Sequence, residues 1–208
     1  MNTSVGGLVF DNTDTTGIRT TGGNGILTIG GGGITTNAGA GAVSFGSPTN
    51  TNGQRMTLAL SADQTWLNNS SNSLTLSARN RVNMASNTTL TFDGTGDFSQ
   101  SGAGNSPITG AGASVVKNGT GTLTLTQTNT YTGSTTINAG TVAMTNNTAL
   151  RDSWLDTAGS IAGDGSNGLK TTVASFLVGG LAGDKDLASV FTTNAGGYDG
   201  LTAMTLRV

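Results

Sequence analysis

The sequence predicts an all-β solenoid, in which short strands joined by tight corners wind into stacked coils. Its composition disfavours long helices, because 34 of the 208 residues are glycine, only 10% are charged and every acidic residue is aspartate. The apolar residues are grouped into short segments, many of which alternate with polar residues at a period of two. Residues 115–144 then place a strand, a polar corner, a second strand and a glycine corner in close succession. This order fits one coil of a solenoid better than a hairpin.

Residues 115–144 are the unit on which this prediction depends. In TLTLT, residues 122–126, alternate side chains face opposite sides of a strand, with leucine on one side and threonine on the other. The next strand segment, residues 134–144, is interrupted by a second corner, Asn-Ala-Gly, at 138–140. The polar corner between the two segments has the composition that turns prefer: Asn129, Tyr131 and Gly133.

The chain before this unit divides into short apolar segments separated by turns, which suggests coils of about 20 residues. Four consecutive glycines at 30–33 predict a sharp corner, since glycine adopts positive φ and allows neighbouring backbone to approach closely. Residues 47–54 are expected to form a loop and residues 93–97 a tight turn. The segments expected to be strands are 8–10, 26–29, 34–36, 43–45, 56–60, 64–68, 74–76, 82–84 and 90–92.

The second half of the chain is less regular. Residues 101–113 are poor in apolar side chains, which predicts a protruding loop. The composition changes after residue 149, and residues 149–155 are the one stretch where a single helical turn is expected. We expect residues 1–208 to form one solenoid domain with 115–144 as its repeat-like core. Further strands are predicted at 173–178 and 201–206.

Charge and hydropathy argue against two kinds of partner. The formal net charge is −2 and the cations are spread along the sequence, so no phosphate-binding surface for nucleic acid is expected. Arg79 and Arg81 are the closest pair, and we expect them on a solvated face. No segment approaches the ~20 apolar residues of a membrane-spanning helix. The N-terminus shows no signal peptide, so any export signal is expected to lie outside this sequence.

The residue types present also argue against catalysis. Histidine and cysteine are absent, which removes Ser-His-Asp and Cys-His nucleophiles and the usual zinc ligands. Paired aspartates could in principle form an acid/base pair or bind calcium, but aspartate in a glycine-rich turn is ordinarily a turn former. We therefore predict no catalytic, cofactor-binding or metal-binding residue. The pairs considered are Asp93 with Asp97, Asp184 with Asp186, and Asp164 with Asn167.

Threonine occupies every second position from Thr122 to Thr132. Stacked threonine rows on a flat face could order water and bind ice. Outward threonine is also simply favourable in strands because it is β-branched, and this series crosses a corner. We therefore expect it to be ordinary strand surface.

The unit at 115–144 resembles the autotransporter-associated β-strand repeat of bacterial secreted passenger proteins. The resemblance rests on KNGTGTLTL at 117–125, NTYTG at 129–133 and TINAGTV at 136–142, in which glycine, tyrosine and strand positions fall at the spacing of that family. It implies a right-handed parallel β-helix that serves as an extracellular stalk or adhesin. The family has no shared catalytic residues to carry over.

We therefore predict a structural segment of a bacterial surface or secreted protein, located outside the cell or on its surface, without enzymatic activity or a cofactor. Its partners are expected to be further copies that associate end to end into a fibre, neighbouring repeats of a longer chain, or surface glycans. The alternative is a carbohydrate-active β-helix of the lyase or hydrolase type, or a passive carbohydrate-binding module. A binding module would need an exposed aromatic side chain, although a lone Trp is more often a core filler. The candidates are Trp66, Trp154 and Tyr131.

Overall fold

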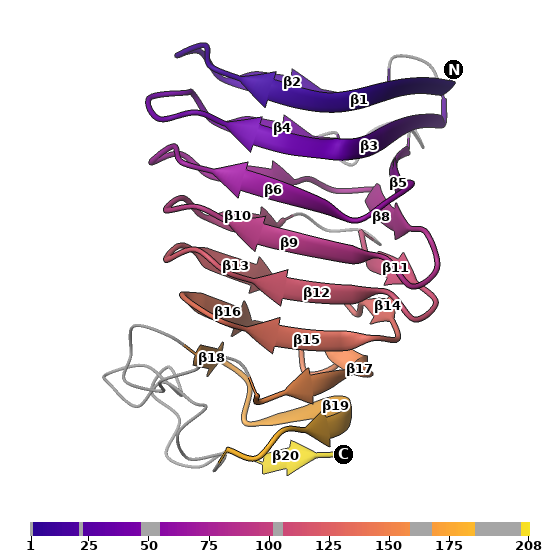
Figure 1. The fold of residues 1–208 in the computed structure, drawn as a ribbon, viewed down its shortest axis with the longest axis vertical. Helices are drawn as coiled ribbons and strands as arrows, with labels where there is room; N and C mark the ends of the chain where they lie inside the picture. Colours follow the sequence, from indigo (N-terminus) through magenta and orange to yellow (C-terminus); the bar gives the residue numbers. More distant parts are fainter. Residues whose placement is uncertain (1, 21–22, 47–54, 102–105, 159–167, 186–204) are drawn as a thin grey trace.

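The computed structural model describes residues 2–20, 23–46, 55–101, 106–158, 168–185 and 205–208. These residues form twenty β-strands, and no helix occurs among them. Every strand pair recorded between them is parallel. Figure 1 shows the strands stacked as coils along one axis, which confirms the predicted all-β solenoid. Within the described ranges there is accordingly no helix that could cross a membrane.

The strands stack on three faces. The first face contains β5 (Met56–Leu60), β8 (Asn80–Met84), β11 (Ile108–Gly110), β14 (Thr130–Tyr131) and β20 (Thr205–Arg207). The second face contains β6 (Gln64–Asn68), β9 (Thr89–Asp93), β12 (Ser114–Lys117) and β15 (Ser134–Ile137). Four longer strands bend from the first face onto the second: β1 (Asn2–Phe10), β3 (Gly25–Thr36), β17 (Leu150–Asp156) and β19 (Ser175–Ala182).

The third face is a seven-stranded sheet. It contains β2 (Thr16–Ile18), β4 (Val43–Phe45), β7 (Leu74–Leu76), β10 (Phe98–Gln100), β13 (Thr122–Leu125), β16 (Thr141–Met144) and β18 (Gly168–Thr171). A 13-stranded sheet covers the other two faces.

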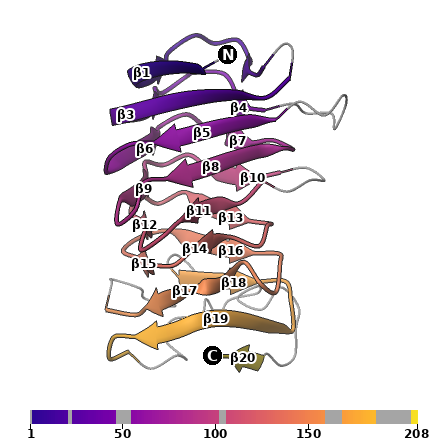
Figure 2. The same ribbon diagram turned by 90° about the vertical axis from the view of Figure 1, so that its right-hand side faces the viewer.

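The coils wind in a right-handed sense. In Figure 1 the second-face strands run leftward across the front, the chain returns behind them on the third face, and each new coil lies below the last. Figure 2 shows the first-face strands that complete each coil. The architecture is therefore the right-handed parallel β-helix that the sequence resemblance implies.

Coil length varies along the stack, and the register shifts within two of the ladders, between β1 and β3 and between β17 and β19. In the predicted repeat, one coil leads from Leu123 to its partner Val142. An earlier coil is much longer, since it leads from Val43 to its partner Leu74. The short coil that the sequence predicts therefore holds only around the repeat.

The core is a single column of inward side chains. The burial of β5, β6, β7 and β13 alternates at a period of two, as expected for strands with one face against the core. Trp66, Phe92 and Phe98 pack edge to face in this column, with ring centroids 5.5 Å and 5.0 Å apart. Trp66 is fully buried and donates its Nε1–H to Gln64 Oε1 at 2.8 Å, so its predicted role as a core filler is confirmed.

The predicted glycine corner at 30–33 lies where β3 changes face. Residues 25–29 pair with β5, and residues 34–36 pair with β6. Gly33 has φ 61°, and a Cβ at this position would lie 2.0 Å from the carbonyl oxygen of Thr65 in the next coil. Only glycine fits this backbone and this spacing. The strand nevertheless continues through the corner, which the sequence did not indicate.

Two local predictions are wrong. Residues 149–155 were expected to contain a helical turn, but Leu150–Asp156 form strand β17, because Leu150 and Leu155 face the core and pair with β19. The expected loop at 101–113 contains strand β11, whose Ile108 is fully buried and pairs with Val82. Residues 47–54, 102–105 and 201–204 lie outside the described residues.

Candidate functional site

Aspartates at the corner between the second and third faces join consecutive coils. Asp93 Oδ1 accepts hydrogen bonds from the backbone N–H groups of Gly94 (2.7 Å) and Gly119 (2.9 Å). Asp97 Oδ1 accepts the N–H of Thr122 at 2.7 Å. Because Gly119 and Thr122 belong to the next coil, each carboxylate spans one step of the stack. The two aspartates considered as an acid/base pair are thus engaged with backbone donors at a corner.

Lys117 lies at the same corner and is fully buried. It occupies an inward position of β12, and its Nζ donates hydrogen bonds to the carbonyl oxygens of Asn118 (3.3 Å) and Gly119. Burial lowers the pKa of Lys117 to about 8, and the nearby carboxylates of Asp93 and Asp97 partly offset this shift. The buried ammonium group therefore binds the carbonyl oxygens of the turn that follows its own strand.

Asn129 is the polar centre of the corner between the third and first faces. It is 1% exposed. Its Oδ1 accepts hydrogen bonds from Gln100 Nε2 (2.8 Å) and the N–H of Ile108 (2.9 Å). Its Nδ2 donates to the carbonyl oxygens of Gln127 (3.3 Å) and Ala149 (3.0 Å). One amide side chain thereby connects the preceding coil, its own coil and the following coil.

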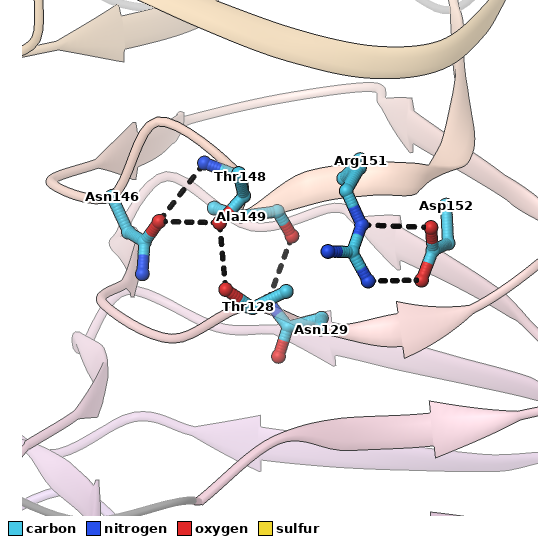
Figure 3. Close-up of polar contacts among 7 residues, drawn as sticks. All are labelled: Thr128, Asn129, Asn146, Thr148, Ala149, Arg151 and Asp152. Atoms are coloured by element: carbon cyan, nitrogen blue, oxygen red, sulfur yellow. Dashed lines mark hydrogen bonds and ion pairs between the residues drawn. The ribbon is translucent and has the colours of Figure 1, made fainter.

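A second group of polar contacts joins the repeat to the coil that follows it (Figure 3). The hydroxyl groups of Thr128 and Thr148 lie 2.6 Å apart, and Asn146 Oδ1 accepts hydrogen bonds from the N–H (2.9 Å) and hydroxyl (2.8 Å) of Thr148. Arg151 and Asp152 form an ion pair nearby, with Nε and Oδ1 3.0 Å apart. This pair lies at the surface, where such contacts contribute little stability.

Tyr131 is buried and carries a chain of hydroxyl contacts. Its hydroxyl lies 2.6 Å from Thr135 Oγ1, which lies 2.7 Å from Ser153 Oγ in the next coil. Ser153 donates to the carbonyl oxygen of Gly133 at 3.0 Å. Burial raises the pKa of Tyr131 to about 12, and the hydrogen bonds with Thr135 and Ser153 partly offset the shift. Tyr131 is therefore a structural residue of the repeat.

Of the three aromatic residues considered for glycan contact, only Trp154 is available to solvent. Trp66 and Tyr131 are buried, whereas Trp154 is 54% exposed. It lies on the second face, where it pairs with Ser134 of the preceding coil and Gly180 of the following coil. Gly180 has no side chain to cover the indole. The site is thus one flat aromatic group on a rigid strand.

The arginines are less scattered than the sequence suggests. Arg79 and Arg81 line a shared pocket with Arg55, and Arg55 belongs to the preceding coil. One coil leads from Met56 to its partner Asn80, and the same spacing brings Arg55 next to Arg79. The expectation of an isolated pair on a solvated face therefore omitted the third arginine.

The described residues contain no group of acidic side chains suited to a metal ion. Asp184 is described, but Asp186, Asp164 and Asn167 lie outside the described residues. The alternating threonines are divided between faces, since Thr122 and Thr124 belong to β13 and Thr130 belongs to β14. They do not form a row along one face.

The comparisons with known proteins agree with this geometry. A family model described as Passenger-associated-transport-repeat matches residues 115–144. No curated protein and no solved structure matches the chain. The matched residues run from β12 to β16 and contain Lys117, Asn129 and Tyr131. The chain therefore contains a passenger-associated transport repeat at residues 115–144, and the resemblance to an autotransporter passenger repeat is confirmed there.

Proposed function

We propose that this chain is a structural segment of a bacterial autotransporter passenger, acting outside the cell as a stiff stalk or as part of an adhesin. The observation that carries the proposal is the passenger-associated transport repeat, whose ladders continue without interruption into the coils on both sides. A continuous solenoid of this kind resists bending because each coil packs on its neighbours over three faces. The function of such a segment is to hold other parts at a distance.

We also propose that the segment has no catalytic role. The charged groups at the corner between the second and third faces are used in backbone contacts: Asp93 and Asp97 accept hydrogen bonds from N–H groups of the next coil, and Lys117 donates to carbonyl oxygens of its own turn. A carbohydrate-active β-helix would need carboxylates that converge on an open groove. A panel of polysaccharide substrates incubated with the purified chain tests this proposal, and release of reducing or unsaturated ends would refute it.

End-to-end association is the third part of the proposal. On one side β1 pairs with β3, and among the described residues no strand covers its other side. An uncovered strand of nine residues presents unpaired backbone groups to another coil. A second copy of this chain, or an adjoining repeat of a longer one, can extend the ladder there.

Negative-stain electron microscopy over a range of concentrations tests this association. Fibres of uniform width that lengthen with concentration are expected if the ends pair, whereas single short rods at every concentration would leave a stalk without self-assembly. Thr3→Lys places a charge on the exposed strand at the end of the stack and should abolish the fibres. Thr75→Lys, on an outward position in the middle of the stack, is the matched control and should leave them intact.

Carbohydrate binding is a second candidate function, favoured by the exposure of Trp154. A flat indole on a rigid strand suits stacking against a sugar ring, and Asp156 lies two positions further along the same strand as a hydrogen-bond acceptor. A glycan array probed with the wild-type chain and Trp154→Ala tests it. Loss of a signal in the variant, with an unchanged melting temperature, would support binding. The absence of any signal for the wild type, or equal signals for both, would reject it.

A further inference from the structure

We propose that Arg55, Arg79 and Arg81 form a binding site for a phosphate or sulfate group. They line a pocket of about 260 Å³ where the third face turns into the first. These are three of the six arginines in a chain whose formal net charge is −2. None of the described residues that line the pocket is acidic.

The register of the ladder places these arginines close together. Met56 pairs with Asn80, and the N–H of Met56 donates to the carbonyl oxygen of Arg79 at 3.3 Å. Arg55 and Arg79, one position earlier, therefore stand above one another in adjacent coils, with backbones separated by about 4.8 Å. Arg81 is paired with Thr57 in the same two coils.

Like charges on adjacent strands repel, and an anion between them would replace this repulsion with attraction. A guanidinium group offers several N–H donors in a planar fork, a shape that matches the oxygens of phosphate and sulfate. Two guanidinium groups on consecutive coils can bind different oxygens of one tetrahedral anion. A monovalent ion without several oxygens would use this arrangement poorly.

The backbone on which the arginines stand is fixed. The N–H of Arg55 donates to Asn24 Oδ1 at 3.2 Å, and its carbonyl oxygen accepts the N–H of Gly25 at 3.0 Å. Arg79 has φ 62°, a left-handed conformation that turns the chain into β8. Asn2, Asn24 and Thr57 line the same pocket, so neutral polar residues lie beside the arginines.

The size of the pocket favours a small group. Its volume of about 260 Å³ lies below the ~300 Å³ lower limit of pockets that enclose whole drug-sized ligands. A single phosphate or sulfate group therefore suits the site, whether it is a free ion or is carried by a larger molecule that extends beyond the pocket.

Calorimetric titration of the purified chain tests the site with four probes: inorganic phosphate, inorganic sulfate, glucose 6-phosphate and N-acetylglucosamine 6-sulfate. The variants are Arg55→Gln and Arg81→Gln, with Arg207→Gln on β20 at the opposite end of the stack as the matched control. We expect each pocket variant to raise Kd by about tenfold or more and the control to leave it unchanged. Binding of the wild type should weaken as sodium chloride is added.

The two kinds of probe distinguish the source of the anion. Equal affinity for inorganic ions and esters would assign the site to a free anion, and at least about tenfold tighter binding of an ester would assign it to a modified sugar. The proposal is overturned if no probe binds the wild type at ~10 mM, or if Arg207→Gln loses as much affinity as the pocket variants. Melting temperatures give a second readout, because sulfate should raise that of the wild type and of Arg207→Gln by more than that of Arg55→Gln.

Discussion

The carboxylate of Asp93 lies 2.9 Å from the backbone nitrogen of Gly119, one coil further along the stack. Asp97 bears the same relationship to Thr122, and Asp63 to the N–H of Thr89, each at 2.7 Å. An aspartate at the corner of one coil thus repeatedly accepts a hydrogen bond from the start of the next. The N–H of Gly119 lies at a corner and those of Thr89 and Thr122 lie at the first position of a strand, so these carboxylates satisfy backbone donors that would otherwise need water.

The first prediction concerns this contact. Asp93→Ala should lower the free energy of unfolding by about 1–3 kcal/mol, because the part-buried N–H groups of Gly94 and Gly119 lose their acceptor. Asp93→Asn keeps an acceptor oxygen in place and should cost less. Urea denaturation followed by circular dichroism measures both. Equal stability of the alanine variant and the wild type would contradict the assigned role.

Asn129 gives a sharper test, because it uses both ends of its amide. Asn129→Asp retains acceptors for Gln100 and Ile108 but removes the donor and places a charge beside the carbonyl oxygens of Gln127 and Ala149. We expect it to destabilise the chain by about 3 kcal/mol, as much as Asn129→Ala. A melting temperature for the aspartate variant close to that of the wild type would show that the donor side contributes nothing.

Lys117 and Tyr131 predict a stability maximum in the alkaline range. The folded-state pKa of Lys117 is about 8 against an ordinary 10.5, so the unfolded chain binds more protons between these values and stability rises with pH there. The folded-state pKa of Tyr131 is about 12 against 10, so ionisation favours the unfolded chain above pH 10 and stability falls. Melting temperatures should therefore rise from pH 8 to 10 and decline beyond pH 10.

Variants of the two residues test which of them causes the rise and which causes the decline of the melting temperature with pH. Lys117→Met should remove the rise between pH 8 and 10 while keeping the decline, and Tyr131→Phe should weaken the decline. Lys170→Met, on an outward position of β18, is the control for the loss of a lysine. If its pH profile changes as that of Lys117→Met does, the rise does not come from the buried ammonium group.

Alanine substitutions at three glycines distinguish the cost of backbone strain from the cost of steric overlap. Gly140 has φ 67°, and a Cβ there would lie 2.4 Å from the carbonyl oxygens of Gly119 and Gly121. Gly39 has φ 82° with no atom near that position, and Gly6 has neither constraint. Gly140→Ala should therefore cost about 3 kcal/mol or more and Gly39→Ala about 1 kcal/mol, while Gly6→Ala should be neutral or slightly stabilising. Chemical denaturation ranks them, and a different order would contradict this account.

Much of the fold follows from the two-residue alternation of apolar side chains. Residues 43–45, 56–60, 64–68 and 74–76 form strands with the predicted bounds, because each carries its inward side chains at the strand period. The strand at 150–156 did not follow from its sequence, because its polar residues break the alternation where β17 bends between faces. Tertiary pairing with β19 decides its conformation.

The polar interior was harder to predict. Lys117 lies two positions after the buried Val115 on the same strand, so the alternation of the strand predicts an inward side chain there. A lysine is nevertheless rarely expected in a core. The meeting of Arg55 with Arg79 depends on the length of one particular coil, and coil lengths differ widely along the stack. The residues that a solenoid brings together can be identified from sequence only when the number of residues in each coil is known.

The unequal lengths of the coils also determine how the solenoid would unfold under tension. Hydrogen bonds between coils run along the long axis, so tension on the two ends acts on the ladders in series and separates one coil at a time. Each separation would release the chain of a single coil, and a long coil would release more of it than a short one. A load applied to its two ends would therefore produce a sequence of small, unequal extensions instead of a single break.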